Sequence, residues 1–182
     1  MITELVFAGF GGQGVLTAGL IFSEMALRAG MEVSWMPAYG PTMRGGKANS
    51  VVKFGDEALG SPNMEEIDAL VAMNQPSLEY AEFMKTEGKV FVNSDMIPED
   101  VKLRDDIEIV RIPCVSLAQQ AKNLKGANLV MAGAVIKTCE FFEKEFAIKT
   151  MKEFFEDKGK EKFNTANETA FLAGFGAAMK SS

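Results

Sequence analysis

The sequence has 182 residues, of which 47% are apolar and 24% charged. A chain of this length can bury one sizeable hydrophobic core but is short for two, so we expect residues 1–182 to form a single domain. The formal charge of −6 argues against a nucleic-acid partner, because neutralising phosphates requires clustered Lys and Arg, and the 19 present are dispersed among 25 acids. The chain has no histidine, which excludes Ser-His and Cys-His nucleophile pairs and most imidazole-ligated zinc sites.

The two cysteines, Cys114 and Cys139, lie far apart without C-x-x-C spacing, so this chain cannot by itself supply the four thiolates of an ordinary iron-sulfur cluster. We interpret both as buried small apolar residues, with a redox role as the alternative. Glu4 interrupts the first apolar run, and no stretch approaches the roughly 18 apolar residues of a transmembrane helix. We therefore expect a cytoplasmic protein without a membrane partner.

Strand-like and helix-like segments alternate from the start of the chain, and after Pro113 only helical patterns remain. Strands are expected at residues 4–9, 32–37, 48–56, 67–74, 89–94 and 107–113. Helices are expected at residues 14–29, 76–87, 115–124, 127–142, 144–157 and 162–180. This alternation predicts a Rossmann-like, three-layer α/β fold, with a mostly parallel sheet, helices on both faces and a helical C-terminal third.

The segment "GFGGQG" matches G-x-G-x-x-G through Gly9, Gly11 and Gly14, between a predicted strand and a predicted helix. Such glycines permit a tight turn and leave amide hydrogens at the helix N-terminus available to an anion or a carbonyl. A dinucleotide site would also need an acidic residue near the end of the second strand to hold the ribose. That place reads "WMPAYG" and has no acid, which disfavours the dinucleotide interpretation.

The segment from Pro37 to Ser50, "PAYGPTMRGGKANS", is the most unusual in the chain. Its prolines and glycines predict a shaped loop, and its polar side chains offer contacts to whatever the loop faces. Arg44 presents a planar fork of donors suited to a carboxylate or a phosphate, with Lys47 as a second positive charge. The alternative is an ordinary loop with a solvated arginine.

The loops after the predicted strands end up at one rim of the sheet if the strands are parallel, and ligands of such folds bind there. Arg44 would then lie near a set of polar side chains, and no general base is evident among them. The polar set consists of Gln13, Asn74, Gln75, Asn93 and Ser94.

Three segments resemble one known family. "GFGGQGVLTAG", "PAYGPTMRGGKANSVV" and "ANLVMAGAV" from Ala127 are similar to the gamma subunit of the 2-oxoacid:ferredoxin oxidoreductases, also called the pyruvate/ketoisovalerate oxidoreductase gamma family. The resemblance covers nearly the whole chain. The "RGG" at Arg44 to Gly46, followed by "ANS", resembles the 2-oxoglutarate and branched-chain 2-oxoacid types more than the pyruvate type.

The resemblance implies a subunit of an enzyme that converts a 2-oxoacid, coenzyme A and oxidised ferredoxin to acyl-CoA, carbon dioxide and reduced ferredoxin. It implies that thiamine diphosphate, Mg and iron-sulfur clusters belong to alpha, beta and delta-type partners, and that this chain is inactive alone. It associates the gamma subunit with the coenzyme A end of the site.

The rim and the resemblance together give the candidate ligand contacts, with no catalytic residue and no metal ligand among them. A free-standing nucleotide-binding oxidoreductase and a purely architectural subunit remain as alternatives. The candidates are Gly9, Gly11, Gly12, Gln13, Gly14, Tyr39, Arg44, Gly45, Gly46, Asn74 and Ser94.

Overall fold

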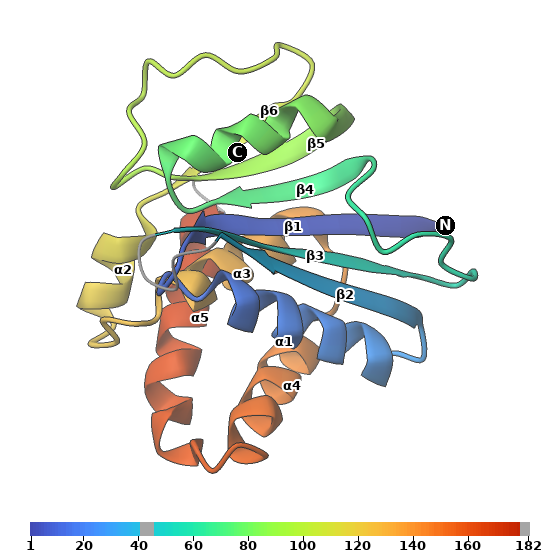
Figure 1. The fold of residues 1–182 in the computed structure, drawn as a ribbon. Coiled ribbons are helices and arrows are strands. Elements are labelled where there is room, and N and C mark those ends of the chain that lie inside the picture. The colour runs from blue at the N-terminus through green and yellow to red at the C-terminus, as the bar shows by residue number, and fades with distance from the viewer. Residues whose placement is uncertain (41–45, 179–182) are drawn as a thin grey trace.

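The computed structural model describes residues 1–40 and 46–178, and it contains one six-stranded sheet with the strand order β2-β3-β1-β4-β5-β6 (Figure 1). The strands are β1 (Ile2–Phe10), β2 (Glu32–Tyr39), β3 (Lys47–Gly55), β4 (Ile67–Ala72), β5 (Met84–Asn93) and β6 (Glu108–Ile112). The α-helices are α1 (Val15–Arg28), α2 (Cys114–Gln120), α3 (Ala127–Cys139), α4 (Lys144–Glu156) and α5 (Asn164–Ala178). The described residues also form two 3₁₀ helices, η1 (Gln75–Phe83) and η2 (Glu161–Phe163).

Most of the sheet is parallel, as predicted. β1 pairs in parallel with β4, β4 with β5, and β5 with β6. β3 is antiparallel to both of its neighbours, β2 and β1, so β3 alone of these six strands runs against the common direction. β3 lies between β2 and β1, because it forms hydrogen bonds with both of these strands.

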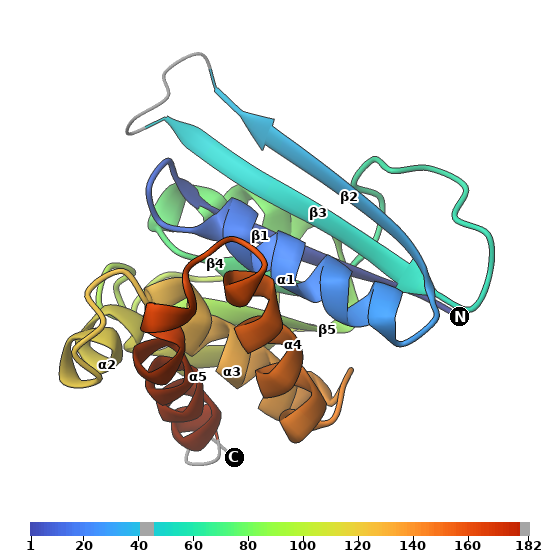
Figure 2. The ribbon, with the colours of Figure 1, turned by 90° about the horizontal axis from the view of Figure 1, so that it is seen from below.

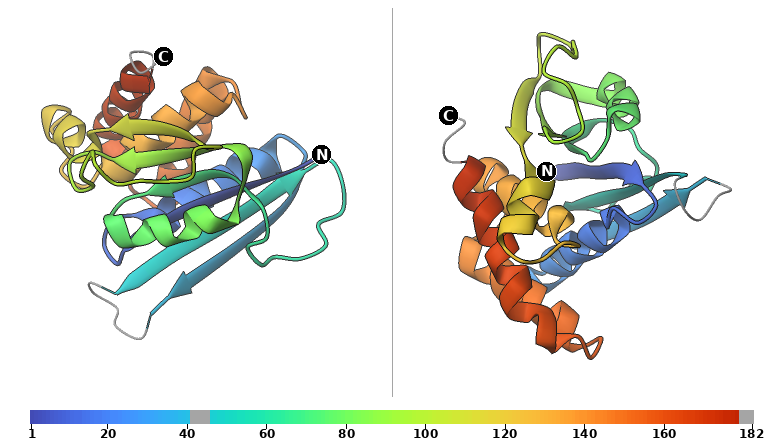
Figure 3. Two further views of the ribbon diagram at one scale, coloured as in Figure 1. Left: turned by 90° about the horizontal axis from the view of Figure 1, so that it is seen from above. Right: turned by 90° about the vertical axis from the view of Figure 1, so that its left-hand side faces the viewer.

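The two faces of the sheet are covered unequally. On one face, side chains such as Phe7 and Val71 pack with residues of all five α-helices in a large core. Figure 2 shows the C-terminal helices and α1 gathered on this face. Residues such as Val6 and Leu70, whose side chains point to the opposite face, join a smaller core. The 3₁₀ helix η1 and the segment that leads to β6 cover this face (Figure 3). The α/β class is therefore confirmed, with α-helices on one face and a 3₁₀ helix on the other.

One predicted helix was wrong in type and extent. Residues 76–87 do not form an α-helix: the 3₁₀ helix η1 ends at Phe83, and Met84 already has extended backbone in β5. Met84 is buried in the smaller core and aligns with Ile67 of β4, so sheet pairing overrides the local helical pattern. None of the described helices is long and apolar enough to cross a bilayer.

Two C-terminal helices end earlier than predicted. Cys139 ends α3 because Glu140 adopts left-handed backbone with φ 52°, and the following Phe142 packs into the large core. Helix α2 ends at Gln120, shortly before Lys122 with φ 56°. The helical C-terminal third itself is confirmed.

Candidate functional site

The strands that share a direction end along one edge of the sheet, called here the rim. The glycine turn after β1, the end of β2 at Tyr39 and the start of β3 at Lys47 meet there, because Phe10 aligns with Lys47 and Tyr39 with Ala48. The ends of β4, β5 and β6 continue the same edge. The structure thus gathers the loops that the sequence placed together.

A pocket of about 610 Å³ opens at this rim beside the first turn of α1. Five of the predicted candidates line it: Gly11, Gly12, Gly14, Tyr39 and Gly46. The rest of the lining consists of residues that were not predicted as contacts: Phe10, Val15, Leu16, Thr17 and Ala48. Their signal in the sequence was their position, immediately after the glycines or opposite them on β3.

The glycine turn has the geometry that its sequence predicts. Gly12 and Gly14 have φ of 98° and 75°, in the left-handed region that favours glycine. The Gly11 N–H donates to the Gly46 carbonyl oxygen at 2.9 Å, which joins the turn to the start of the β3 segment. Gly14 is the N-cap of α1, and its carbonyl accepts the first helical bond from the Ala18 N–H at 3.0 Å.

The pocket combines backbone donors with apolar walls. Helix geometry leaves the amides of Val15, Leu16 and Thr17 without acceptors inside α1, and these three residues line the pocket. The positive end of the helix dipole favours an anion or a carbonyl at this place. Phe10 and the exposed Tyr39 add aromatic surface. The described lining carries no charged side chain.

Four predicted candidates lie at the rim outside the described pocket lining. Gly9 is in β1, Asn74 is 2% exposed and caps η1 by accepting from the Ser77 N–H at 3.1 Å, and Ser94 is half-buried after β5. The side chain of Gln13 forms hydrogen bonds with Phe10, Met73 and Asn74. Arg44 and Gly45 lie outside the described residues.

Two polar side chains of the Pro37–Ser50 segment contact η1. Lys47 Nζ forms an ion pair with Glu79 at 2.8 Å, and Asn49 Nδ2 donates to the Tyr80 hydroxyl at 2.9 Å. The positive charge of Lys47, which the sequence offered to a ligand, is therefore balanced within the chain.

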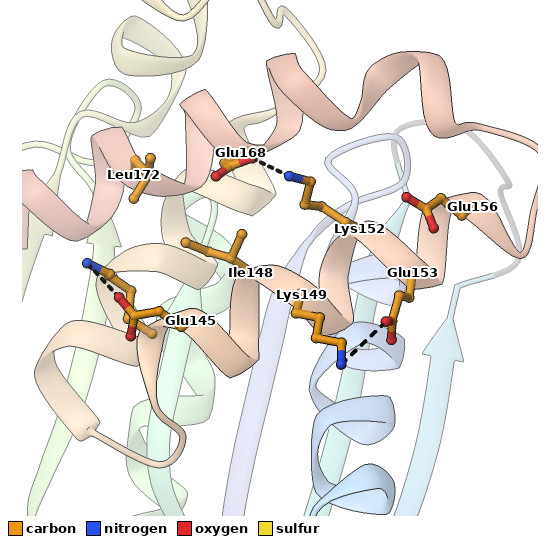
Figure 4. Close-up of a pocket in the computed structure, with 9 residues that line it drawn as sticks. Glu145, Ile148, Lys149, Lys152, Glu153, Glu156, Glu168 and Leu172 are labelled. Carbon is orange, nitrogen blue, oxygen red and sulfur yellow. Dashed lines mark hydrogen bonds and ion pairs between the residues drawn. The ribbon is translucent and has the colours of Figure 1, made fainter.

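A second pocket, of about 550 Å³, lies along α4 and α5 and contains none of the predicted residues (Figure 4). Its lysines and glutamates pair with each other, for example Lys152 with Glu168 at 2.7 Å and Lys144 with Glu145 at 3.1 Å. Exposed pairs of this kind contribute little to stability. Because the charges are balanced locally, this groove offers no clear preference for a ligand.

Cys114 is buried, as predicted, whereas Cys139 at the end of α3 is only partly buried, and neither thiol is an activated nucleophile at neutral pH. Burial raises the pKa of Cys114 to about 12, and the negative charge of Asp95 adds to the shift. Burial also raises the pKa of Cys139 to about 12. Neither thiol forms an appreciable amount of thiolate near pH 7.

Comparison with known proteins identifies the class that this fold and rim define. The family model described as pyruvate ferredoxin/flavodoxin oxidoreductase matches residues 4–177, and the chain belongs to this family. The chain is 38% identical, over 130 residues, to ketoisovalerate oxidoreductase subunit VorA of Methanothermobacter marburgensis, which covers 71% of the chain and 27% of that relative. The chain thus spans about a quarter of the length of that subunit.

A second relative matches over nearly its full length. The 2-oxoglutarate synthase subunit KorC of Methanothermobacter thermautotrophicus is 32% identical over 178 residues, covering 94% of the chain and 92% of the relative. Among solved structures, the gamma subunit of keto/oxoacid ferredoxin oxidoreductase from Geobacter sulfurreducens superposes with a TM-score of 0.81 at 28% identity, covering 98% of the chain and 99% of that structure.

A larger solved chain contains the same fold as a part. The 2-oxoglutarate:ferredoxin oxidoreductase of Magnetococcus marinus, with 2-oxoglutarate, coenzyme A and succinyl-CoA bound, superposes with a TM-score of 0.87 at 22% identity. It covers 100% of this chain, which spans 32% of that structure. At this identity the likeness is one of fold.

Proposed function

We propose that residues 1–182 form one gamma-type domain of a 2-oxoacid:ferredoxin oxidoreductase, and that it shapes the coenzyme A side of the active site. The reaction converts a 2-oxoacid and coenzyme A to acyl-CoA and carbon dioxide while ferredoxin is reduced. The proposed oxoacid is 2-oxoglutarate or a branched-chain 2-oxoacid, because relatives named for both substrates match this chain. The proposed partners are alpha, beta and delta-type subunits in the cytoplasm, with ferredoxin as acceptor.

The rim pocket is the observation that carries this proposal. Its volume of about 610 Å³ lies in the range of small-molecule sites, and it joins the N-terminus of α1 to aromatic walls. In the proposed complex, the N–H groups of the first turn of α1 donate to a phosphate or carbonyl oxygen of coenzyme A, and Phe10, Leu16 and Tyr39 contact its less polar parts. We propose ligand contact for Gly11, Gly12, Gly14, Tyr39 and Gly46.

This chain cannot by itself complete an ordinary iron-sulfur cluster, which needs four thiolates, because Cys114 and Cys139 are its only cysteines. We propose that thiamine diphosphate, Mg and the clusters are held by the partner subunits, and that coenzyme A is the one small molecule contacted here. The pairing of Arg44 with a coenzyme A phosphate stays a prediction.

The test uses the assembled complex with two variants at one pocket position. Leu16→Glu and Leu16→Gln have nearly the same shape, and both are tolerated near a helix N-terminus, where a carboxylate is even favourable. Only Glu repels the anionic coenzyme A. We expect the KM for coenzyme A to be about tenfold higher for Leu16→Glu than for Leu16→Gln. A change of this size corresponds to the free energy of about one interaction between charged groups.

The control is oxoacid decarboxylation measured without coenzyme A, which we expect to be unchanged in both variants. Equal KM values for the two variants in an intact complex mean that coenzyme A does not reach this pocket, and the architectural alternative then replaces this proposal. Turnover with 2-oxoglutarate compared with a branched-chain 2-oxoacid assigns the substrate.

A further inference from the structure

Gln13 lies in the middle of the glycine turn, and its part-buried side chain forms hydrogen bonds with neighbouring segments of the chain. Its Oε1 accepts from the Phe10 N–H at 2.7 Å and from Asn74 Nδ2 at 3.2 Å. Its Nε2 donates to the Met73 carbonyl oxygen at 3.3 Å. A single amide therefore connects the turn after β1 to the end of β4.

The groups that hold Gln13 are themselves fixed. Asn93, fully buried at the end of β5, donates from Nδ2 to the same Met73 carbonyl oxygen at 3.0 Å. Asn74 Oδ1 accepts from both the N–H and the hydroxyl of Ser77, at 3.1 and 2.8 Å. The turn is thus anchored to β4, β5 and η1 through the part-buried Gln13 and the buried amides of Asn74 and Asn93, and exclusion of water strengthens the bonds of these two.

The first glycine of the motif makes room for this amide. A Cβ on Gly9 would lie 2.6 Å from Gln13 Oε1 and 2.9 Å from the Met73 Cβ, both closer than real contacts. The absence of a side chain at Gly9 is therefore explained by Gln13, without any ligand approaching that position.

The same side chain closes the turn that forms one wall of the pocket. The Phe10 N–H donates to Gln13 Oε1, and the Gln13 N–H donates to the Phe10 carbonyl oxygen at 3.1 Å. Phe10, Gly11, Gly12 and Gly14 all line the pocket, and two of them have left-handed backbone. Glycines hold no conformation by themselves, so an outside constraint is needed to keep this wall in one shape.

We propose that Gln13 is a positioning residue that fixes the Phe10–Gly14 wall in the shape that receives coenzyme A. This inference rests on the proposed function. Without the amide, the turn samples other conformations, and the affinity for the ligand falls with the fraction of molecules that keep the competent one. We expect the group-transfer chemistry to be unaffected, because the Gln13 amide makes its hydrogen bonds within the chain, to Phe10, Met73 and Asn74.

The experiment compares Gln13→Ala and Gln13→Met with Gln120→Ala, which removes an exposed glutamine from α2. Met fills the space of Gln without its hydrogen bonds. In the assembled complex we expect both Gln13 variants to raise the KM for coenzyme A about tenfold and to leave kcat within about twofold. A raised KM with an unchanged kcat is the pattern of a variant that weakens binding without changing the chemical step. Gln120→Ala should match the wild type.

A second readout needs no activity. In the full chain, the Phe10 amide should exchange its hydrogen at least about tenfold faster in both Gln13 variants, because it loses its acceptor, while amides in the centre of β1 keep their protection. Normal Phe10 exchange in Gln13→Ala, or a normal coenzyme A KM in Gln13→Met, overturns the positioning role.

The two proposals fail in different ways. If Leu16→Glu raises the KM for coenzyme A and the Gln13 variants do not, the pocket binds coenzyme A and the role of Gln13 is wrong. If Leu16→Glu and the Gln13 variants all leave that KM unchanged, the proposed function of the pocket is wrong. Faster exchange of the Phe10 amide would then show only that Gln13 stabilises the turn.

Discussion

At the scale of single residues, Gly12 and Gly14 share left-handed backbone and differ in their surroundings. A Cβ on Gly12 would meet nothing within 4 Å, whereas one on Gly14 would lie 2.5 Å from Asn128 Nδ2. That amide donates to the Gly14 carbonyl oxygen at 3.0 Å, and Asn128 is 6% exposed.

This difference predicts unequal costs for the same substitution. Gly12→Ala should lower the free energy of unfolding by about 1–2 kcal/mol, the strain of a left-handed alanine. Gly14→Ala should cost about 1 kcal/mol more, because the added Cβ pushes the buried Asn128 amide away from the carbonyl oxygen of residue 14. Urea unfolding of both variants measures the two values. Equal losses would show that Asn128 adjusts without cost.

The sequence was informative about which residues reach the rim and less so about where their side chains point. The glycine pattern gave the turn, and five of the predicted candidates line the pocket. Gln13 and Asn74 were predicted as ligand contacts from their polarity, but their amides bond to Phe10, Met73 and Ser77. Side-chain direction depends on buried acceptors contributed by strands about 60 residues away, such as Met73 at a sequence separation of 60, and no local pattern encodes it.

At the scale of elements, α3 and α5 pack directly against each other, and two glycines permit their close approach. A Cβ on Gly174 would lie 1.7 Å from the Val130 carbonyl oxygen, and one on Gly133 would lie 2.0 Å from the Phe171 carbonyl oxygen. Backbone cannot move aside as a flexible side chain does. The two helices can therefore pack at this distance only if both positions lack a side chain.

Substitution within α5 tests this contact with a control in the same helix. Gly174→Ala should lower the free energy of unfolding by about 1–3 kcal/mol, because the two helices must separate. Gly176→Ala, where a Cβ would meet nothing within 4 Å, should raise it by about 0.5–1 kcal/mol through helix propensity. Thermal unfolding distinguishes these opposite signs, and a stabilised Gly174→Ala would contradict the close packing.

Elements with strong periodicity were predictable, and their pairing was not. The six strands and the helices α1, α3, α4 and α5 were found from local patterns, with ends displaced by a few residues. The error at residues 76–87 arose because Met84 pairs with Ile67 across the sheet. The placement of β3 between β2 and β1 likewise depends on contacts between distant segments, which alternation alone does not reveal.

At the scale of the whole molecule, the family could be recognised from its loops, because the glycine turn and the Pro37–Ser50 segment carry specific sequence at the rim. The composition also indicated that the redox chemistry lies elsewhere. With no histidine and with Cys114 and Cys139 as its only cysteines, the chain has few groups that bind metals or clusters. These two thiols are too few to supply the four ligands of an ordinary iron-sulfur cluster.

The purified 182-residue chain should therefore be colourless in the visible range and inactive, even when it is given thiamine diphosphate, Mg, coenzyme A, a 2-oxoacid and an electron-accepting dye. An ordinary cluster needs four thiolates, and the chain contains two cysteines. Co-purification with alpha, beta and delta-type partners should restore both the cluster absorbance and dye reduction that depends on the oxoacid and on coenzyme A. The control is the same partner set purified without this chain, which should retain its clusters and lose coenzyme A-dependent turnover. Dye reduction by the single chain would place the redox centre here and overturn the assignment of the cofactors to the partners, whereas full turnover by the partners alone would remove the gamma-type domain from the coenzyme A site.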